Sequence, residues 1–185
     1  MKKFVEESWL VLVMGIGFAL LLAGTQTALQ GRISENRMRA TREAIAEVVP
    51  GVVSTEVSEI EGYVVFTCRD EQGDLLGWAI EGSGTGFVDR IRLVVGLSAD
   101  RERITGVKVT DNLETPGLGN KIAEPEWASQ FEGLHASRDV EITKGPADTA
   151  DNEVQGITGA TWSSRYTADI VNAILEKVRP HLEQP

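Results

Sequence analysis

A long stretch without charge near the N-terminus constrains this chain more than any other feature. No charged residue occurs between Glu7 and Arg32, and Trp9 to Gly24 is almost wholly apolar. About 20 such residues are needed for a helix that spans a bilayer core. The sequence therefore predicts a single transmembrane helix over residues 8–30, preceded by a short N-terminal cytoplasmic tail over residues 1–7.

A cleaved signal peptide is the alternative, because Lys2 and Lys3 give the chain a basic start. The apolar stretch is longer than in most signal peptides, and Thr25 to Thr27 would make a poor cleavage site. No cysteine follows the Leu22–Gly24 stretch, which argues against a lipoprotein anchor. We therefore expect the helix to be retained.

The charges beside the helix do not settle its orientation. Lys2 and Lys3 precede it, whereas four arginines follow it: Arg32, Arg37, Arg39 and Arg42. Because positive charge favours the cytoplasmic side, this pattern alone does not predict an exported C-terminal domain. Long domains can nevertheless be translocated despite flanking charge.

Composition excludes several classes of function. The net charge of the 185 residues is −10 and the basic residues form no long run, which argues against binding to nucleic acid. Cys68 is the only cysteine, so the chain cannot form an internal disulfide or a cysteine-based metal or iron–sulfur site. His135 and His181 are the only histidines, and they indicate neither a hydrolytic triad nor a metal site.

The residues after the membrane segment predict a stalk helix and one α+β domain. Ser34 is a suitable cap for a helix that runs to Glu47, and Pro50–Gly51 would end it, which gives a stalk over residues 31–50 and a domain over residues 51–185. Apolar runs between turn residues predict strands at Gly62–Cys68, Leu75–Ile80, Val88–Leu97, Ile104–Thr110 and Val140–Thr143. Helical spacing is found at Glu126–Phe131 and at Arg165–Leu182. Strands joined by hairpins and followed by helices indicate a mostly antiparallel sheet with flanking helices.

A glycine-rich segment, Gly82–Phe87, precedes the third predicted strand. It lacks the Gly-Lys-Ser/Thr ending of a nucleotide-binding P-loop. We therefore predict a structural turn there.

The segment Thr158-Gly159-Ala160-Thr161-Trp162-Ser163-Ser164 stands just before the last predicted helix. The first turn of a helix has unpaired backbone N–H groups and favours negative charge. Small residues permit close approach, so such a turn can hold a phosphate. Ordinary capping by serine or threonine is the alternative that the residues alone leave open.

A second segment, Glu114-Thr115-Pro116-Gly117-Leu118-Gly119, combines a stiffening proline with two glycines. Gly117 and Gly119 would allow main-chain groups to approach a planar ligand. A surface turn is the alternative for this segment.

In this order and at this spacing, the two segments resemble the FMN-binding domain shared by the G subunit of Rnf complexes and the C subunit of sodium-translocating NADH:quinone reductases. The resemblance runs from about Gly51 to His181. It implies that a separate flavin transferase attaches FMN to Thr161 through a phosphoester, and that the second segment packs against the flavin. The residues implied around the cofactor are Thr158, Gly159, Ala160, Ser163, Ser164, Glu114, Thr115, Pro116, Gly117, Leu118 and Gly119.

Three further residues bear on this resemblance. Lys144 could be a cation near the flavin, where it would stabilise the reduced anionic form, or it could be a solvated lysine at a strand end. Gln155 stands where the family usually has an aspartate, which could affect modification. Trp162 is bulkier than the usual aliphatic residue, and it could pack against the flavin or anchor the helix.

The resemblance implies a membrane-anchored flavoprotein subunit that relays electrons within an Rnf-type ion-translocating ferredoxin:NAD oxidoreductase, with the flavin domain outside the cytoplasmic (inner) membrane. Its partners would be the other membrane and peripheral subunits of the complex. The alternatives are a C subunit of a sodium-translocating NADH:quinone reductase and a membrane-tethered binding or sensor module without redox relay. A stand-alone reductase is disfavoured because no segment resembles a nicotinamide site. The coupling ion, Na⁺ or H⁺, stays open.

Overall fold

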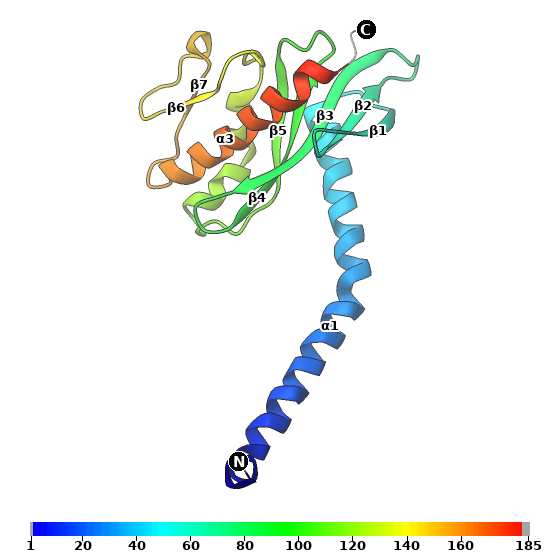
Figure 1. Cartoon of the computed structure of the whole chain (residues 1–185). Coiled ribbons are helices and arrows are strands. Elements are labelled where there is room, and N and C mark those ends of the chain that lie inside the picture. Colours follow the sequence, from blue (N-terminus) through cyan, green and yellow to red (C-terminus); the bar gives the residue numbers. More distant parts are fainter. Residues whose placement is uncertain (1, 183–185) are drawn as a thin grey trace. The chain divides into compact units, whose positions relative to one another are not determined.

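One uninterrupted helix forms the N-terminal part of the chain. The computed structural model describes residues 2–182, and helix α1 spans Lys2–Val48 (Figure 1). From Trp9 to Leu22 its large apolar side chains are exposed, and its apolar part is long enough to cross a membrane, with a mean hydropathy of 2.0 over 18 residues. The predicted tail is helical from Lys2 onward, and Met1 lies outside the described residues.

The prediction that a second helix begins at Ser34 is wrong, because α1 continues through this residue. The chain divides into two units, Met1–Arg39 and Ala40–Pro185, so the last turns of α1 belong to the globular unit. Ala44, Ile45 and Val48 are buried there, and the Thr105 hydroxyl donates a hydrogen bond to the carbonyl oxygen of Val48 at 2.5 Å. The globular unit therefore begins before residue 51, the predicted boundary. The helix ends where Pro50–Gly51 predicted, at Val48.

A five-stranded antiparallel sheet forms the centre of the globular unit, with strands in the order of the chain (Figure 1). The strands are β1 (Ser54–Ile60), β2 (Tyr63–Arg69), β3 (Leu75–Thr85), β4 (Arg90–Ser98) and β5 (Ile104–Asp111). The α+β prediction is confirmed, and β2 to β5 correspond to predicted strands. Strand β1 was not predicted.

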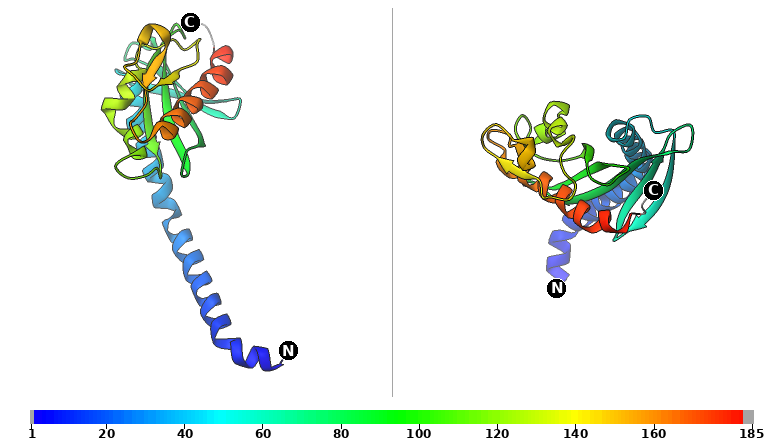
Figure 2. Two further views of the ribbon diagram at one scale, coloured as in Figure 1. Left: turned by 90° about the vertical axis from the view of Figure 1, so that its left-hand side faces the viewer. Right: turned by 90° about the horizontal axis from the view of Figure 1, so that it is seen from above.

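Both faces of the sheet are covered. Successive side chains along a strand point to opposite faces, and in the central strands the side chains on both faces are apolar. On β4, Leu93 and Val95 point to one face and Val94 to the other, and all three are fully buried. Helix α3 (Thr161–Val178) packs on the first face and buries Val171 and Ile174 against the sheet (Figures 1 and 2). The last turns of α1 pack on the second face.

The glycine-rich segment predicted as a turn belongs largely to strand β3, which continues to Thr85. A Cβ atom at Gly84 would lie 2.5 Å from Cγ1 of Ile170, and one at Gly82 would collide with the side chain of Ile174. These two glycines therefore allow α3 to cross close to the sheet. The turn itself is confined to the residues from Gly86 to Asp89, where the Gly86 N–H donates to the Asp89 carbonyl oxygen at 2.7 Å.

Short elements connect β5 to α3. They are η1 (Gly119–Ala123), α2 (Pro125–Ala128), η2 (Ser129–Phe131), β6 (Glu141–Thr143), η3 (Thr149–Asp151) and β7 (Glu153–Gln155), and η4 (Arg179–His181) follows α3. The predicted short helix and β6 are confirmed, whereas β7, the parallel partner of β6, was not predicted. Asn152 is fully buried at φ 64°, and its side-chain amide donates to the carbonyl oxygens of His135, Arg138 and Asp139. This single side chain, which directly precedes β7, orders the loop of residues 135–139 that leads into β6.

Candidate functional site

The two segments singled out in the sequence meet around a small hollow of about 80 Å³. The stretch between β5 and η1 contributes Thr115, Leu118 and Gly119 to its lining. The segment that leads into α3 contributes Gly159, Ala160, Thr161, Trp162 and Ser163, and Phe87 comes from the β3–β4 loop. Residues 40 or more positions apart in the two segments thus line one hollow.

Thr161 is the first residue of α3 and lines the hollow. The preceding residue, Ala160, provides no side-chain cap, and no acidic residue occurs in the first turn. The Ser164 N–H donates to the Ala160 carbonyl oxygen at 3.1 Å, so the N–H groups of residues 161–163 precede the first i→i−4 bond of the helix. Unpaired N–H groups beside a positive dipole end can bind a phosphate. The helix begins earlier than the predicted Arg165, and this earlier start is what brings Thr161 into its first turn.

The four hydroxyl groups of the segment differ in their accessibility. Thr158 is exposed and Thr161 is half-buried, whereas Ser163 and Ser164 are buried. Of the two accessible threonines, only Thr161 lines the hollow. The structure therefore distinguishes residues that the sequence motif presents together.

The hydroxyl groups of Ser163 and Ser164 bond within the protein. Ser163 donates to the Glu114 carboxylate at 2.6 Å. Ser164 donates to the Ala160 carbonyl oxygen at 3.1 Å and accepts from the Ile157 N–H at 3.0 Å. Both side chains point inward, so in this structure the donors available to a phosphate are the main-chain N–H groups.

The Glu114–Gly119 segment presents its ends and its middle to different environments. Glu114 and Gly119 are buried, whereas Thr115, Pro116, Gly117 and Leu118 are exposed. Gly117 has φ 76°, a conformation that favours glycine, and its N–H donates to the Asn120 side chain at 2.8 Å. Thr115, Leu118 and Gly119 line the hollow and could contact a ligand there, whereas the side chain of Glu114 is turned away from solvent.

Large apolar side chains remain exposed around the hollow. The exposed fractions are 61% for Phe87, 44% for Leu118 and 56% for Trp162. The Trp162 ring lies 6.1 Å from the Tyr166 ring, and the Arg165 guanidinium lies 5.6 Å from the Trp162 centroid. Apolar and aromatic surface beside a phosphate-binding helix terminus suits a planar ring with a phosphate tail. FMN fits this arrangement of residues.

Lys144 and Gln155 lie elsewhere. Lys144 is exposed directly after β6 and does not line the hollow. Gln155 has an exposed side chain, and its main chain is fixed on both sides: its N–H donates to Gln130 and its carbonyl oxygen accepts from the Trp127 indole at 2.8 Å. An aspartate at this position would likewise be presented to solvent.

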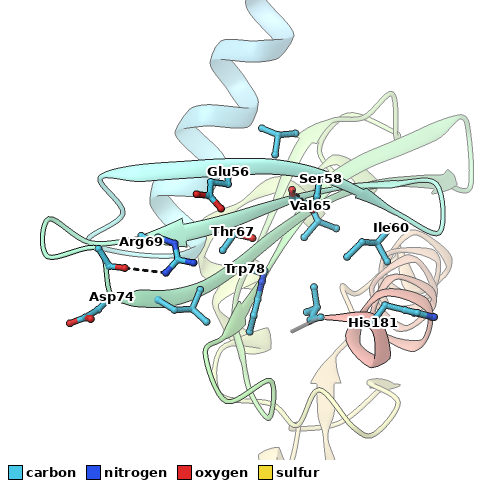
Figure 3. A pocket seen from close by; sticks show the side chains of 13 residues that line it. Glu56, Ser58, Ile60, Val65, Thr67, Arg69, Asp74, Trp78 and His181 are labelled. Atoms are coloured by element: carbon cyan, nitrogen blue, oxygen red, sulfur yellow. Dashed lines mark hydrogen bonds between the residues drawn. The ribbon is translucent and has the colours of Figure 1, made fainter. Parts of the chain in front are cut away.

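A larger groove of about 610 Å³ lies apart from these segments (Figure 3). It is formed by β1, β2, β3 and the residues after α3, with Trp78 and Val65 in its floor and Glu56, Arg69 and His181 among its lining residues. Neither motif contributes to it. The groove is larger than the hollow, but it contains none of the chemistry that the motifs predict.

Comparisons with known proteins identify the family and agree with FMN as its cofactor. A family model described as an FMN-binding domain matches residues 86–176. The G subunit of an ion-translocating oxidoreductase complex from Methanosarcina acetivorans is 31% identical, and the match covers 96% of this chain and 95% of that protein. The G subunit of a Na⁺-translocating ferredoxin:NAD⁺ oxidoreductase complex from Acetobacterium woodii is 28% identical, with 95% of each chain covered.

Solved structures of another subunit type share the fold. The crystal structure of NqrC from Shewanella oneidensis superposes with a TM-score of 0.58 at 25% identity, covering 68% of this chain and 64% of that chain. The C subunit of the Na⁺-translocating NADH-quinone reductase from Parabacteroides distasonis superposes with a TM-score of 0.65 at 19% identity, covering 82% and 94%.

The fold and the site thus define an FMN-binding-domain protein that begins with one helix long and apolar enough to cross a membrane. Within that class, near-complete coverage at 31% identity is decisive. The chain belongs to the family of G subunits of ion-translocating oxidoreductase complexes.

Proposed function

We propose that this protein is a membrane-anchored flavoprotein subunit of an Rnf-type ion-translocating oxidoreductase, and that it carries FMN covalently on Thr161. The observation that carries the proposal is the convergence of the two motif segments on one hollow, with Thr161 at the start of a helix. The accessible threonine, the unpaired N–H groups of the first turn and the exposed rings of Phe87 and Trp162 all support FMN as the ligand.

FMN would supply the redox chemistry, because it exchanges one or two electrons. The protein's own contribution is to hold and orient the group. The N–H groups of residues 161–163 would hold the phosphate, while Leu118, Phe87 and Trp162 would provide apolar surface for the ring. The role of the subunit would be electron relay, with turnover belonging to the assembled complex.

Attachment to Thr161 requires a separate flavin transferase, since a threonine hydroxyl is a weak nucleophile unless a base activates it. With FAD as the donor, the Thr161 oxygen would form the new bond to phosphorus, the pyrophosphate bond would break, AMP would leave, and the hydroxyl proton would be released. The exposed loop from Thr158 to Gly159 gives a transferase access to this position.

The family also suggests partners and location. The G-subunit relatives are components of multi-subunit complexes, so other membrane and peripheral subunits are the expected partners. We assign the flavin domain to the extracytoplasmic side by analogy with the family, against the positive charge that follows the apolar helix.

The extent of the matches favours a G subunit over the C subunit of a quinone reductase. The chain matches G subunits over 95% of their length, but the C subunit from Haemophilus ducreyi over only 41% of its length. A binding or sensor module without flavin is the remaining alternative, and the one feature in its favour is Gln155 in place of the family's aspartate.

Intact-mass measurement of Thr161→Ala tests the proposal. Protein produced with a flavin transferase should be heavier than the bare chain by one FMN less one water, and the variant should lose both this mass and in-gel flavin fluorescence. Thr158→Ala is the matched control, since it removes an exposed hydroxyl of the same segment that does not line the hollow. Covalent flavin that persists on Thr161→Ala would refute the assignment.

A further inference from the structure

Glu114 is a buried carboxylate at the centre of the site. Only 3% of the residue is exposed, and none of the ion pairs in the described part of the chain includes it. Oε2 accepts a hydrogen bond from the Ser163 hydroxyl at 2.6 Å, and Oε1 accepts one from the Val88 N–H at 3.0 Å. Buried carboxylates are stable only when their oxygens are satisfied in this way.

These two bonds join three segments of the chain. Val88 lies in the β3–β4 loop, Glu114 in the stretch after β5, and Ser163 in the first turn of α3, two residues after Thr161. Helix α3 has neither a side-chain cap nor an acidic residue in its first turn. The Glu114 side chain therefore bonds to the first turn of α3 from another part of the chain.

The space for this carboxylate is created by two glycines. A Cβ atom at Gly119 would lie 2.7 Å from the Ser163 oxygen and 3.0 Å from Oε2 of Glu114, and one at Gly86 would collide with Oε1. Neither distance leaves room for a side chain. The pair is thus enclosed by the same motif segments that line the hollow.

We propose that Glu114 is a positioning residue: through Ser163 and Val88 it clamps the first turn of α3 to the β3–β4 loop and so fixes Thr161 in the geometry needed for flavin attachment. The proposal rests on the proposed function for its effect on FMN. It assigns to Glu114 a role that differs from direct contact with the flavin, because its side chain is enclosed by protein.

Three variants of the full-length protein in detergent separate the clamp from other effects. Glu114→Ala removes both bonds, and Ser163→Ala removes one. Glu114→Gln can keep both, since its amide oxygen can accept from the Val88 N–H while its amide nitrogen donates to the Ser163 oxygen.

The first measurement is the rate of covalent flavin loading by purified transferase and FAD. Loading of Glu114→Ala should be slower by about tenfold or more, because small displacements of a reacting group are costly, and Glu114→Gln should restore a rate close to wild type. Wild-type loading of Glu114→Ala, or a folded Glu114→Gln that loads as slowly as Glu114→Ala, would overturn the clamp. If Glu114→Ala does not fold, slowed loading of Ser163→Ala carries the same test.

The second measurement needs no flavin. A double-mutant cycle on the denaturation midpoints of flavin-free Glu114→Ala, Ser163→Ala and the double variant should be non-additive, because each single change removes the same hydrogen bond. Additive midpoints would show that the two residues are not coupled and would overturn the proposal. This cycle is independent of FMN. A wild-type protein that fails to take up flavin would refute the proposed function, whereas the cycle would still test the clamp.

Discussion

A methyl group at Gly119 should destabilise the globular unit even when no flavin is present. Its Cβ atom would lie 2.7 Å from the Ser163 oxygen and 3.0 Å from both Cβ and Oε2 of Glu114. Those side chains are each only 3% exposed, so they cannot swing into solvent to relieve the contact. The helix or the β5–η1 segment must shift instead, and the 2.6 Å hydrogen bond between the two side chains would be strained or lost.

Overpacking in a dense interior costs about 1 to 3 kcal/mol, and loss of a hydrogen bond to a charged group costs about 1.5 to 3 kcal/mol. Because both changes affect the same pair, they are not fully additive, and we expect Gly119→Ala to lower the free energy of unfolding by about 2 to 4 kcal/mol. With a urea m-value of about 2 kcal/mol per molar, the denaturation midpoint should fall by about 1 to 2 M.

Urea denaturation of the detergent-solubilised full chain, followed by tryptophan fluorescence, measures this shift, since Trp78 and Trp127 are buried in the globular unit. Gly145→Ala is the matched control: a Cβ atom there meets no atom within 4 Å, and its backbone does not require a positive φ. The free energy of unfolding of the control should change by no more than about 0.5 kcal/mol. A Gly119→Ala protein that unfolds at the wild-type midpoint would refute the close packing of Glu114, Ser163 and Gly119.

Two further predictions concern the membrane helix and the cysteine. A reporter that is active only after export should be active when fused after Pro185 and inactive when fused before Trp9, and the reverse pattern in an activity assay would put the flavin domain in the cytoplasm. Burial raises the pKa of the Cys68 thiol from 9.0 to about 11, so it should resist alkylation near neutral pH until the protein is denatured, as mass spectrometry can measure. Because the unfolded state then loses this proton first, the free energy of unfolding should fall as pH rises from about 9 to about 11, and a flat profile would contradict the burial.

The strands that could be predicted from the sequence are those that bury apolar side chains. The runs in β2 to β5 contain fully buried residues such as Val65, Ile80, Leu93 and Ile104. Strand β1, by contrast, is an edge strand with the sequence Ser54–Ile60, and all of its residues but Ile60 are exposed. With no buried face it lacks the alternation that identifies a strand. The turn that joins it to β2, Glu61-Gly62, was the available signal, since both residues have positive φ as a two-residue hairpin requires.

The sequence could not distinguish two structural roles of glycine in this chain. In Gly82 and Gly84 the missing side chain serves a helix that packs across the strand, whereas in Gly117 it serves a turn with positive φ. Both situations favour the same residue for different physical reasons. Only the position of α3 on the sheet decides between them, and α3 comes about 80 residues later in the chain.

The sequence predicted which segments would form the candidate site, but not how their side chains are oriented. The order and spacing of the two segments agree with their meeting around one hollow, yet they gave no indication that the Ser163 hydroxyl bonds to the buried Glu114 carboxylate while Thr115, Leu118 and Thr161 line the hollow. A sequence motif identifies the residues that a site requires, but it does not tell which of them contact the ligand. In this protein the inward-facing residues belong to both segments and depend on one another: Glu114 needs the Ser163 hydroxyl as a donor, and both need the absence of a side chain at Gly119. A change at Ser163 leaves the buried carboxylate short of a bond, a change at Gly119 leaves it short of space, and the loss of Glu114 itself frees the first turn of α3, which carries Thr161.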